Sequence, residues 1–325
     1  TEHCRYRTAA ICHAFALRDH RCQRYRISDP CRHRTFCLIL FQIPGSQYEH
    51  KSEVQASQYA NIEWKDCGSA KHATIRVIIN KRSIQEEKSM NKILADMHTH
   101  TIASGHAYAT LTEMCKEAAN KGLEIYGITE HSSGTPGTCA DIYFQNLRVV
   151  PRDLFGLDLR LGAEINIIDY NGTLDLDQKY IDRLDFVIAG IHSVCYKFGS
   201  KEENTAAIIN AIKNPNVNII SHPDDGRCPL DYEALVQAAK EYHVLLEINN
   251  NALRDKNRKN VKENQKLIIE NCKKYNHPFI MGSDAHFTTD IANYDHCGPL
   301  VESMNVDNEL IMNYYPDRLR EFLRK

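Results

Sequence analysis

Seven short apolar runs recur between residues 93 and 286, and longer segments of mixed character separate them. The runs lie within ILADMHTH, IYGITEH, LRLGAEIN, FVIAGIH, VNIISHP, VLLEINN and FIMGSDAH. A run of four to eight residues rich in Val, Ile and Leu is typical of a strand buried on both faces. The pattern therefore predicts seven buried strands.

The separating segments predict amphipathic helices. Over Leu111–Gly122 the apolar residues recur with i, i+3, i+4 spacing, and Gly122 supplies a stop. Similar patterns occur in KEENTAAIINAIKN, DYEALVQAAKEY and NVKENQKLIIENCKKY. Alternating strands and helices predict a parallel sheet covered by helices. Seven strands favour a TIM-like α/β barrel over a doubly wound sheet, which would carry a Gly-rich phosphate loop after its first strand.

A His, Asp or Glu accompanies the end of each predicted strand. A lone histidine there is more often an ordinary hydrogen-bonded loop residue, but the repetition along the chain is not explained that way. The carboxyl ends of parallel barrel strands meet at one mouth, so these side chains are expected to converge. The candidates are His98, His100, His106, His131, Glu164, His192, His222, Asp284 and His286.

The spacing of these candidates indicates a metal site. His98 and His100 are two residues apart at a strand end, so both face the same side, and Asp284 and His286 repeat this geometry. Glu164 has two oxygens that can bridge neighbouring cations. Nine ligands exceed what one tetrahedral zinc ion uses, and two to three ions fit better.

Residues 1–89 differ from residues 90–325. The first region shows no sustained periodicity and carries 15 Lys/Arg against 9 Asp/Glu, a net charge of +6. The second carries 25 against 33, a net charge of −8. Because MNKILADMHTHT has the character of a natural domain start, we expect residues 1–89 to be an N-terminal extension that is non-native or disordered. A small accessory module is the alternative.

Bulk composition places the protein among soluble globular chains. The 325 residues are 42% hydrophobic and 25% charged, with a net charge of −2. The longest apolar stretch, Phe36–Ile43, is far shorter than the roughly 20 residues that span a bilayer. The 12 cysteines form no CxxC pair, so we interpret them as reduced thiols of a cytoplasmic protein.

Eight ordered motifs carry a family resemblance. DMHTHT, GHAYATL, GITEH, GAEIN, IAGIH, ISHPDD, LEINN and GSDAH resemble the successive motifs of the PHP (polymerase and histidinol phosphatase) family, and more narrowly its small bacterial stand-alone phosphatases with a trinuclear metal site. The resemblance runs from about Asn91 to the C-terminus. It implies a metal-dependent phosphatase domain over residues 90–325, folded as a PHP-type distorted (β/α)7 TIM-like barrel.

The resemblance also implies three zinc ions, with manganese or iron as an alternative at one position. The implied ligand sets are His98, His100, Glu164 and Asp284 for the first ion; Glu164, His192 and His222 for the second; and His106, His131 and His286 for the third. Two features depart from the family pattern. Glu130 stands where many relatives have Asp, and Asp224 and Asp225 stand where small or neutral residues are expected. The two extra carboxylates would select against highly anionic substrates.

The expected reaction is hydrolysis of a phosphate monoester by a metal-bridging hydroxide, without a side-chain nucleophile. Arg227 and Lys197 are candidates for binding the phosphate of a small phosphorylated substrate, and Asn249 and Asn250 for orienting it. Cys195, near His192, is interpreted as a small buried thiol.

Three alternatives remain open. A phosphodiesterase or nuclease uses the same ions, although an acidic domain is poorly suited to nucleic acid. An amidohydrolase shares the HxH pair but typically adds a modified Lys, and no predicted strand ends in Lys. A non-catalytic metal-binding module generally lacks some of the ligands. Membranes and nucleic acids are not expected partners, and the resemblance allows a homo-oligomer.

Overall fold

The computed structural model describes residues 22–29, 34–41, 60–64, 75–79 and 92–323. The chain divides into two compact units, Thr1–Met90 and Asn91–Lys325. In the first unit, β1 (Cys22–Asp29) pairs antiparallel with β2 (Arg34–Phe41), and β3 (Ala60–Trp64) pairs antiparallel with β4 (Ile75–Ile79). The sequence analysis did not predict these four strands, because residues 1–89 show no sustained periodicity. Most of residues 1–89 lies outside the described residues, so the proposed extension stays a prediction.

The second unit is built on seven parallel strands in chain order, which confirms the predicted barrel. They are β5 (Ala95–Asp96), β6 (Ile125–His131), β7 (Asp158–Asn166), β8 (Val187–Gly190), β9 (Ile219–Ile220), β10 (Leu245–Asn249) and β11 (Phe279–Gly282). A single parallel bridge, Thr99 to Ala285, joins the segments that follow β5 and β11. The barrel is therefore nearly closed, and distorted where the first and last strands meet.

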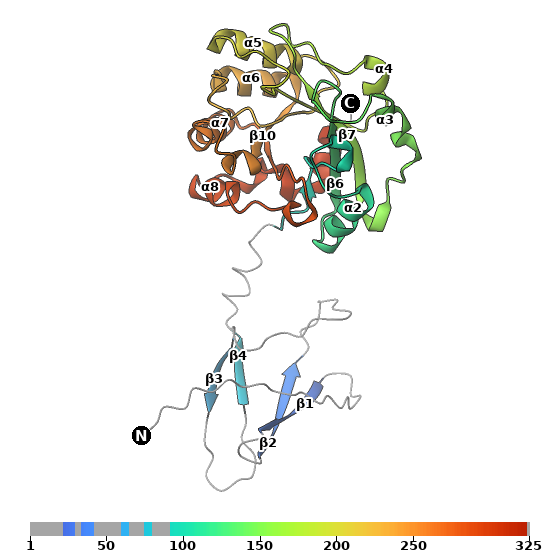
Figure 1. The fold of residues 1–325 in the computed structure, drawn as a ribbon. Helices are drawn as coiled ribbons and strands as arrows, with labels where there is room; N and C mark the ends of the chain where they lie inside the picture. The colour runs from blue at the N-terminus through green and yellow to red at the C-terminus, as the bar shows by residue number, and fades with distance from the viewer. Residues whose placement is uncertain (1–21, 30–33, 42–59, 65–74, 80–91, 324–325) are drawn as a thin grey trace. The chain divides into compact units, whose positions relative to one another are not determined.

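Helices surround these strands, as Figure 1 shows. The four helices predicted from the sequence are present as α2 (Leu111–Asn120), α5 (Lys201–Ile212), α6 (Tyr232–Tyr242) and α7 (Val261–Tyr275). Capping boxes begin α2 at Thr110 and Glu113 and α5 at Ser200 and Glu203. The smaller helices are α3 (Ile142–Asn146), α4 (Gln178–Ile181), α8 (Cys297–Ser303) and α9 (Pro316–Leu323).

Seven short 3-10 helices complete the connections between these elements. They are η1 (Ile102–Ser104), η2 (Leu147–Val149), η3 (Leu154–Gly156), η4 (Asn251–Leu253), η5 (Thr288–Asp290), η6 (Asn308–Leu310) and η7 (Met312–Tyr314). In the part of the chain that the structure describes, no helix combines the length and the apolar character needed to cross a membrane.

The lower, N-terminal end of the barrel is packed with apolar side chains. One cluster contains Ala95, Ile125, Ile188, Ile219 and Leu245, each at the start or middle of a different strand. The strand register aligns Ala95 with Ile125 and Ile219 with both Ile188 and Leu245, so these side chains share the inner face. A second cluster lies between the strands and the surrounding helices. Burial on both faces explains the continuous apolar runs in the sequence.

One aromatic ring fills the barrel interior near its base. A Cβ atom added at Gly127 or at Gly162 would lie 2.8 Å from the ring of Phe186. The two glycines therefore leave room for a side chain that a larger residue would exclude. Met312 of η7 and Phe322 of α9 belong to the same apolar cluster and cover this end.

Candidate metal centre

Glu164 lies at the centre of the polar mouth, at the opposite end of the strands. Its Oε2 is 3.2 Å from His98 Nε2, 3.5 Å from His100 Nε2 and 3.0 Å from His131 Nδ1. Its Oε1 is 3.2 Å from His192 Nε2 and 2.9 Å from His222 Nε2. The two oxygens thus face two different sets of imidazoles, which is the arrangement needed to bridge two ions.

Asp284 and two further histidines extend the cluster toward solvent. Asp284 Oδ1 is 3.6 Å from His98 Nε2 and 3.3 Å from His100 Nε2. His286 Nε2 lies 3.0 Å from His106 Nε2 at the exposed edge. The ring of His100 lies 4.4 Å from that of His131 and 4.5 Å from that of His286, centre to centre. All nine residues proposed as ligands from the sequence are therefore brought together.

Three groups of ligand atoms are close enough to hold an ion each, since all atoms of a group lie within 4.8 Å of one another. The groups are His98, His100 and Glu164; His131, Glu164 and His192; and His100, His131 and His286. They differ from the expected sets in two ways: Asp284, His222 and His106 belong to none of the three groups, and His100 and His131 each belong to two. The allocation of single residues to single ions stays a proposal.

Hydrogen bonds on the outer side of the rings fix which nitrogen faces the centre. His98 Nδ1 lies 2.7 Å from Glu247 Oε1, and His192 Nδ1 lies 2.7 Å from Asn166 Oδ1. Because these carboxylate and amide oxygens only accept hydrogen bonds, each Nδ1 carries the proton. The Nε2 atom of each ring is then left with a lone pair directed inward, as a metal ligand requires.

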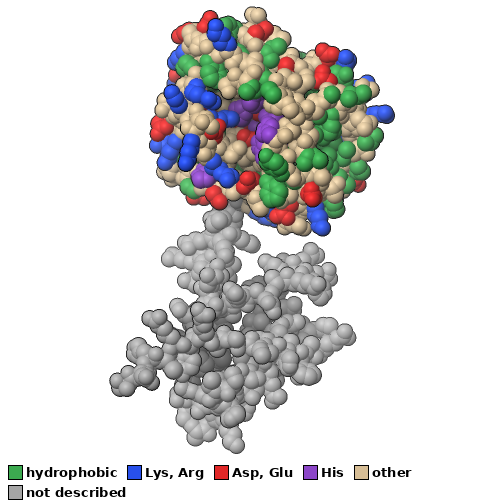
Figure 2. Space-filling model, viewed as in Figure 1, with side chains coloured by type: hydrophobic (Ala, Val, Ile, Leu, Met, Phe, Trp, Pro, Cys, Tyr) green, Lys and Arg blue, Asp and Glu red, His purple; other side chains and the backbone are tan. Residues whose placement is uncertain are grey.

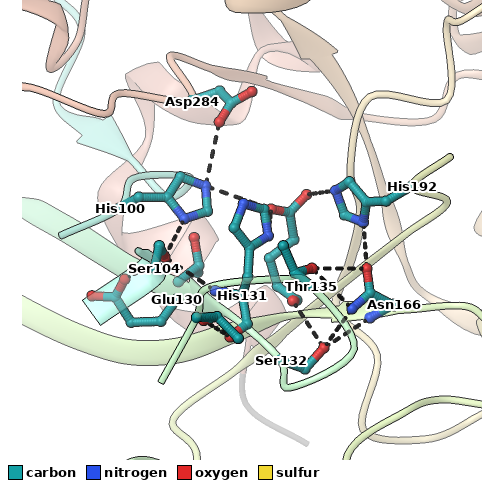
Figure 3. A network of polar contacts seen from close by, with 12 residues as sticks. His100, Ser104, Glu130, His131, Ser132, Thr135, Asn166, His192 and Asp284 are labelled. Atoms are coloured by element: carbon teal, nitrogen blue, oxygen red, sulfur yellow. Dashed lines mark hydrogen bonds and ion pairs between the residues drawn. The ribbon is translucent and has the colours of Figure 1, made fainter. Parts of the chain in front are cut away.

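Ser104 fixes three further ligands at once, as Figure 3 shows for two of them. Its hydroxyl donates to Glu130 Oε2 at 2.5 Å, so its oxygen accepts from His100 Nδ1 at 3.0 Å and from the backbone N–H of His131 at 3.2 Å. Its carbonyl accepts from His106 Nδ1 at 3.0 Å. The buried carboxylate of Glu130 thereby orients the serine, and the serine orients the ligands.

Burial and charge favour the ligand form at His100 and Glu164 but not at His98. Burial lowers the pKa of His100 well below its usual value, and the neighbouring imidazoles lower it further. Burial alone would raise the pKa of Glu164, but His98 and His192 hold that pKa well below its usual range. His98 behaves differently, because Glu247 and Glu164 overcome the effect of burial and raise its pKa. A bound cation would therefore compete with a proton at His98.

The donor atoms that face the centre have no other partner within the described residues. His98 Nε2, His100 Nε2, His131 Nδ1, His192 Nε2 and Glu164 Oε2 are all buried without a hydrogen bond. Buried polar atoms are almost always satisfied, so a convergent unsatisfied set of imidazole and carboxylate donors fits a group of divalent cations.

Two adjoining recesses open over this cluster. The histidine recess, about 310 Å³, is lined by the cluster together with Asn251 and Arg258. The side recess, about 350 Å³, shares His106, His131, His192 and Arg258 with it and continues to Val194, Asp225, Arg227 and Asp255. Figure 2 shows histidine side chains at the bottom of a hollow with basic side chains beside it.

The residues predicted to contact substrate differ in whether they line the two recesses. Arg227 lines the side recess, whereas Lys197 is exposed and lines neither recess. Asn249 Nδ2 lies 3.4 Å from Asp284 Oδ2. Asn250 is buried, and its Oδ1 accepts from the backbone N–H groups of His296 and Cys297. Its observed role is therefore to hold the start of α8.

Asp224 and Asp225, which the sequence adds as two carboxylates near the mouth, each face an arginine. Asp225 pairs with Arg227 Nη2 at 2.6 Å, and Asp224 Oδ1 faces Arg258 Nη1 at 3.6 Å. Each carboxylate therefore has its own cation. Sequence reasoning missed Arg258 because it stands in a polar loop without periodicity. Glu247 also escaped notice, although a carboxylate inside the apolar run VLLEINN was a readable signal.

Comparison with known proteins identifies the family of the chain. The PHP domain family model matches residues 96–271. A protein of Caldicellulosiruptor saccharolyticus named probable phosphatase is 48% identical over 231 residues, covering 70% of this chain and 95% of that protein. A probable phosphatase of Acetivibrio thermocellus is 42% identical over 234 residues, covering 72% and 96%.

Among solved structures, the chain is similar to histidinol phosphate phosphatase of Lactococcus lactis complexed with zinc, L-histidinol and phosphate. That similarity has a TM-score of 0.47 at 18% identity and covers 66% of this chain and 95% of that chain. The family match and the identities to curated relatives decide the classification. The chain belongs to the PHP domain family.

Proposed function

We propose that this PHP-family phosphatase hydrolyses phosphate monoesters of small molecules, using water that bound divalent ions acidify. The observation that carries the proposal is the set of buried, unsatisfied donor atoms around Glu164, with their outer ring nitrogens already hydrogen-bonded. Such preorganisation has no structural use without cations, because burying unpaired polar groups is costly.

The donor set favours zinc, since imidazoles outnumber carboxylates. Three ions are proposed, with manganese or iron as the alternative at the position of His98, His100, Glu164 and Asp284, which has two carboxylates. When bound, the ions would supply a nucleophile by lowering the pKa of water and would neutralise the phosphoryl charge. The protein holds the ligands in place and surrounds the phosphoryl group with a recess.

The Cys195 thiol is not activated as a competing nucleophile. Burial raises the pKa of the Cys195 thiol, so it stays protonated near neutral pH. Cys195, interpreted from the sequence as a small buried thiol, is only partly buried. Its raised pKa supports water as the nucleophile.

Several observations weigh against the alternatives. The side recess carries the carboxylates Asp225 and Asp255, and residues 90–325 are acidic, whereas a nucleic-acid track is basic. None of the strands β5–β11 ends in Lys, which disfavours amidohydrolase chemistry. A non-catalytic module is disfavoured because all nine candidate ligands are in place.

A cytoplasmic location and a homo-oligomeric state belong to this proposal as well. The described cysteines, Cys115, Cys139, Cys195, Cys228, Cys272 and Cys297, are free thiols, which supports a reducing compartment. Assembly can be tested by the mass of the purified chain in solution.

The test is metal content and phosphate release by the full chain. We expect release from p-nitrophenyl phosphate, little release from bis(p-nitrophenyl) phosphate, and about three ions per chain. His98→Ala and Asp284→Ala should abolish turnover while circular dichroism shows intact folding. Turnover that survives both substitutions and chelators would reject the proposal, and faster cleavage of the diester would favour the phosphodiesterase alternative.

A further inference from the structure

One arginine occupies an unusual place between the two recesses. Among the described residues, Arg258 is the one cationic side chain other than histidine that lines both the histidine recess and the side recess. It lies in the loop between η4 and α7, and its side chain is only 16% exposed. A guanidinium buried to this degree is normally held by hydrogen-bonded carboxylates.

Arg258 lacks such bonds. Its Nη1 is 3.6 Å from Asp224 Oδ1 and its Nε is 3.7 Å from Asp255 Oδ2, and both distances exceed that of a hydrogen bond. Nη1 is buried without any hydrogen-bond partner. The two carboxylates therefore balance the charge of Arg258 while leaving its donors free.

Arg227 provides an internal comparison in the same recess. Its Nε and Nη2 donate to both carboxylate oxygens of Asp225, at 2.6 to 3.1 Å. The donors of Arg227 are thus already used by Asp225. Of the two arginines, Arg258 is the one whose guanidinium has no hydrogen-bonded carboxylate. A guanidinium without such a partner can recognise phosphate oxygens.

Asp224 is itself rigidly held behind Arg258. It is fully buried, and its Oδ2 accepts from Gln265 Nε2 at 2.7 Å. Gln265 Nε2 also donates to the carbonyl of Asn249 at 2.7 Å, which ties the pair to the end of β10. The remaining oxygen, Asp224 Oδ1, has no hydrogen-bond partner and lies on the side of Arg258.

Arg258 lies beside the metal cluster, because it lines the histidine recess together with His222 and Glu164. An anion bound in that recess would therefore lie within the field of this guanidinium.

Building on the proposed function, we propose that Arg258 binds the phosphoryl oxygens of the substrate in the histidine recess, and that Asp224 positions its guanidinium. The leaving group then lies in the side recess, against Val194 and the Asp225–Arg227 pair. The assignment makes Arg258 the phosphate-binding arginine in place of Arg227 and Lys197.

The experiment compares substitutions of two arginines from one loop in the metal-loaded full chain. Arg258→Met and Arg258→Lys are tested, with Arg254→Met as the matched control. Arg254 pairs with Asp290 at 3.4 Å, has a side chain 44% exposed and lines neither recess. The measurements are the Kd for inorganic phosphate by calorimetry, kcat and KM for p-nitrophenyl phosphate, and metal content.

We expect Arg258→Met to weaken phosphate binding roughly 10- to 100-fold and to raise KM similarly, with unchanged metal content, because hydrogen bonds to a charged group are lost. Arg258→Lys should lose less, since the charge remains without the fork. Asp224→Asn should weaken phosphate binding by a smaller factor, and Arg254→Met should match the parent chain.

Phosphate affinity and KM that stay within twofold of the parent in Arg258→Met and Arg258→Lys would overturn the assignment. If Arg258→Met fails to fold, Arg258→Lys decides the outcome by the same two measurements. Calorimetry separates this inference from the proposed function: a parent chain that binds metal and phosphate but hydrolyses no ester refutes the function, while the Arg258 variants still report on the binding residue.

Discussion

The two ends of the barrel differ in whether their buried polar atoms have hydrogen-bond partners. At the N-terminal end, apolar side chains fill the barrel interior. His277, which precedes β11 at this end, has a hydrogen-bond partner: its Nε2 lies 2.9 Å from the carbonyl oxygen of Val244. At the mouth, by contrast, the inward nitrogens of His98, His100, His131 and His192 are buried without a hydrogen-bond partner. One end is arranged for packing, and the other keeps unsatisfied donors for a ligand.

The comparison shows how one fold separates stability from function. Removing an apolar contact at the base lowers the free energy of unfolding, because the interior is close-packed. Losing a donor at the mouth removes a ligand atom and relieves desolvation, so folding is affected less than activity. Substitutions at the two ends therefore test whether stability and activity change independently.

The largest effect is expected from Glu164→Gln at the mouth. The amide keeps the shape of the side chain but removes the charge that faces five imidazoles. We expect kcat/KM to fall on the order of 10³-fold or more, since the proposed bridging ligand would be lost. Steady-state kinetics and metal content measure the loss. An active variant with full metal content would show that Glu164 is not the bridging group.

At the base, Phe186→Ala should have the reverse signature. The ring lies against Gly127 and Gly162, so its removal leaves a cavity that the glycines cannot fill. We expect the free energy of unfolding to fall by about 3–5 kcal/mol, with kcat per folded molecule unchanged. Denaturant titration measures the first and active-site-normalised kinetics the second. A large fall in kcat at full folding would contradict the separation of the two ends.

The sequence predicted most of this architecture for identifiable reasons. Strands buried on both faces leave continuous apolar runs, and parallel strands bring their carboxyl ends together, so residues as far apart as His98 and Asp284 could be grouped before any coordinates. The residues that support the ligands were not predicted. Ser104 ends the single-turn helix η1 and Arg258 stands in a loop, and their roles depend on hydrogen bonds and distances that no periodicity encodes.

Charge balance was the other feature that the sequence could not give. Asp224 and Asp225 are adjacent and were read together as added negative charge. In the structure they serve two different arginines from two different loops. The Asp225–Arg227 pair is local, two residues apart. The Asp224–Arg258 pair joins two distant loops, which is a tertiary property that composition near a motif does not determine.

The buried histidine at the base predicts a pH effect on stability. Burial lowers the pKa of His277 to about 4, from an ordinary value of 6.5 in the unfolded chain. Since the folded state binds this proton less readily, its contribution is full above pH 6.5 and is lost as the pH falls toward 4. Between pH 7.5 and pH 5, the unfolding free energy of the parent should fall by roughly 2 kcal/mol more than that of His277→Gln. Equal pH dependence in the two proteins would reject the burial of a neutral imidazole.

The smallest effect is expected from the hydrogen bonds that orient the ligand side chains at the mouth. Ser104→Ala removes the acceptor of His100 Nδ1 and the link to Glu130, but leaves the carbonyl that binds His106. Support of this kind typically changes metal affinity by 10- to 100-fold, and a loss of about tenfold is expected because one of the contacts persists. Competition with a chelator measures the affinity, and Ser104→Thr should restore it by returning the hydroxyl. The matched control is Ser303→Ala, whose hydroxyl donates only to Leu300 on α8. Unchanged metal affinity in Ser104→Ala would mean that packing alone orients the ligands. The mouth would then depend on packing, as the base of the barrel does.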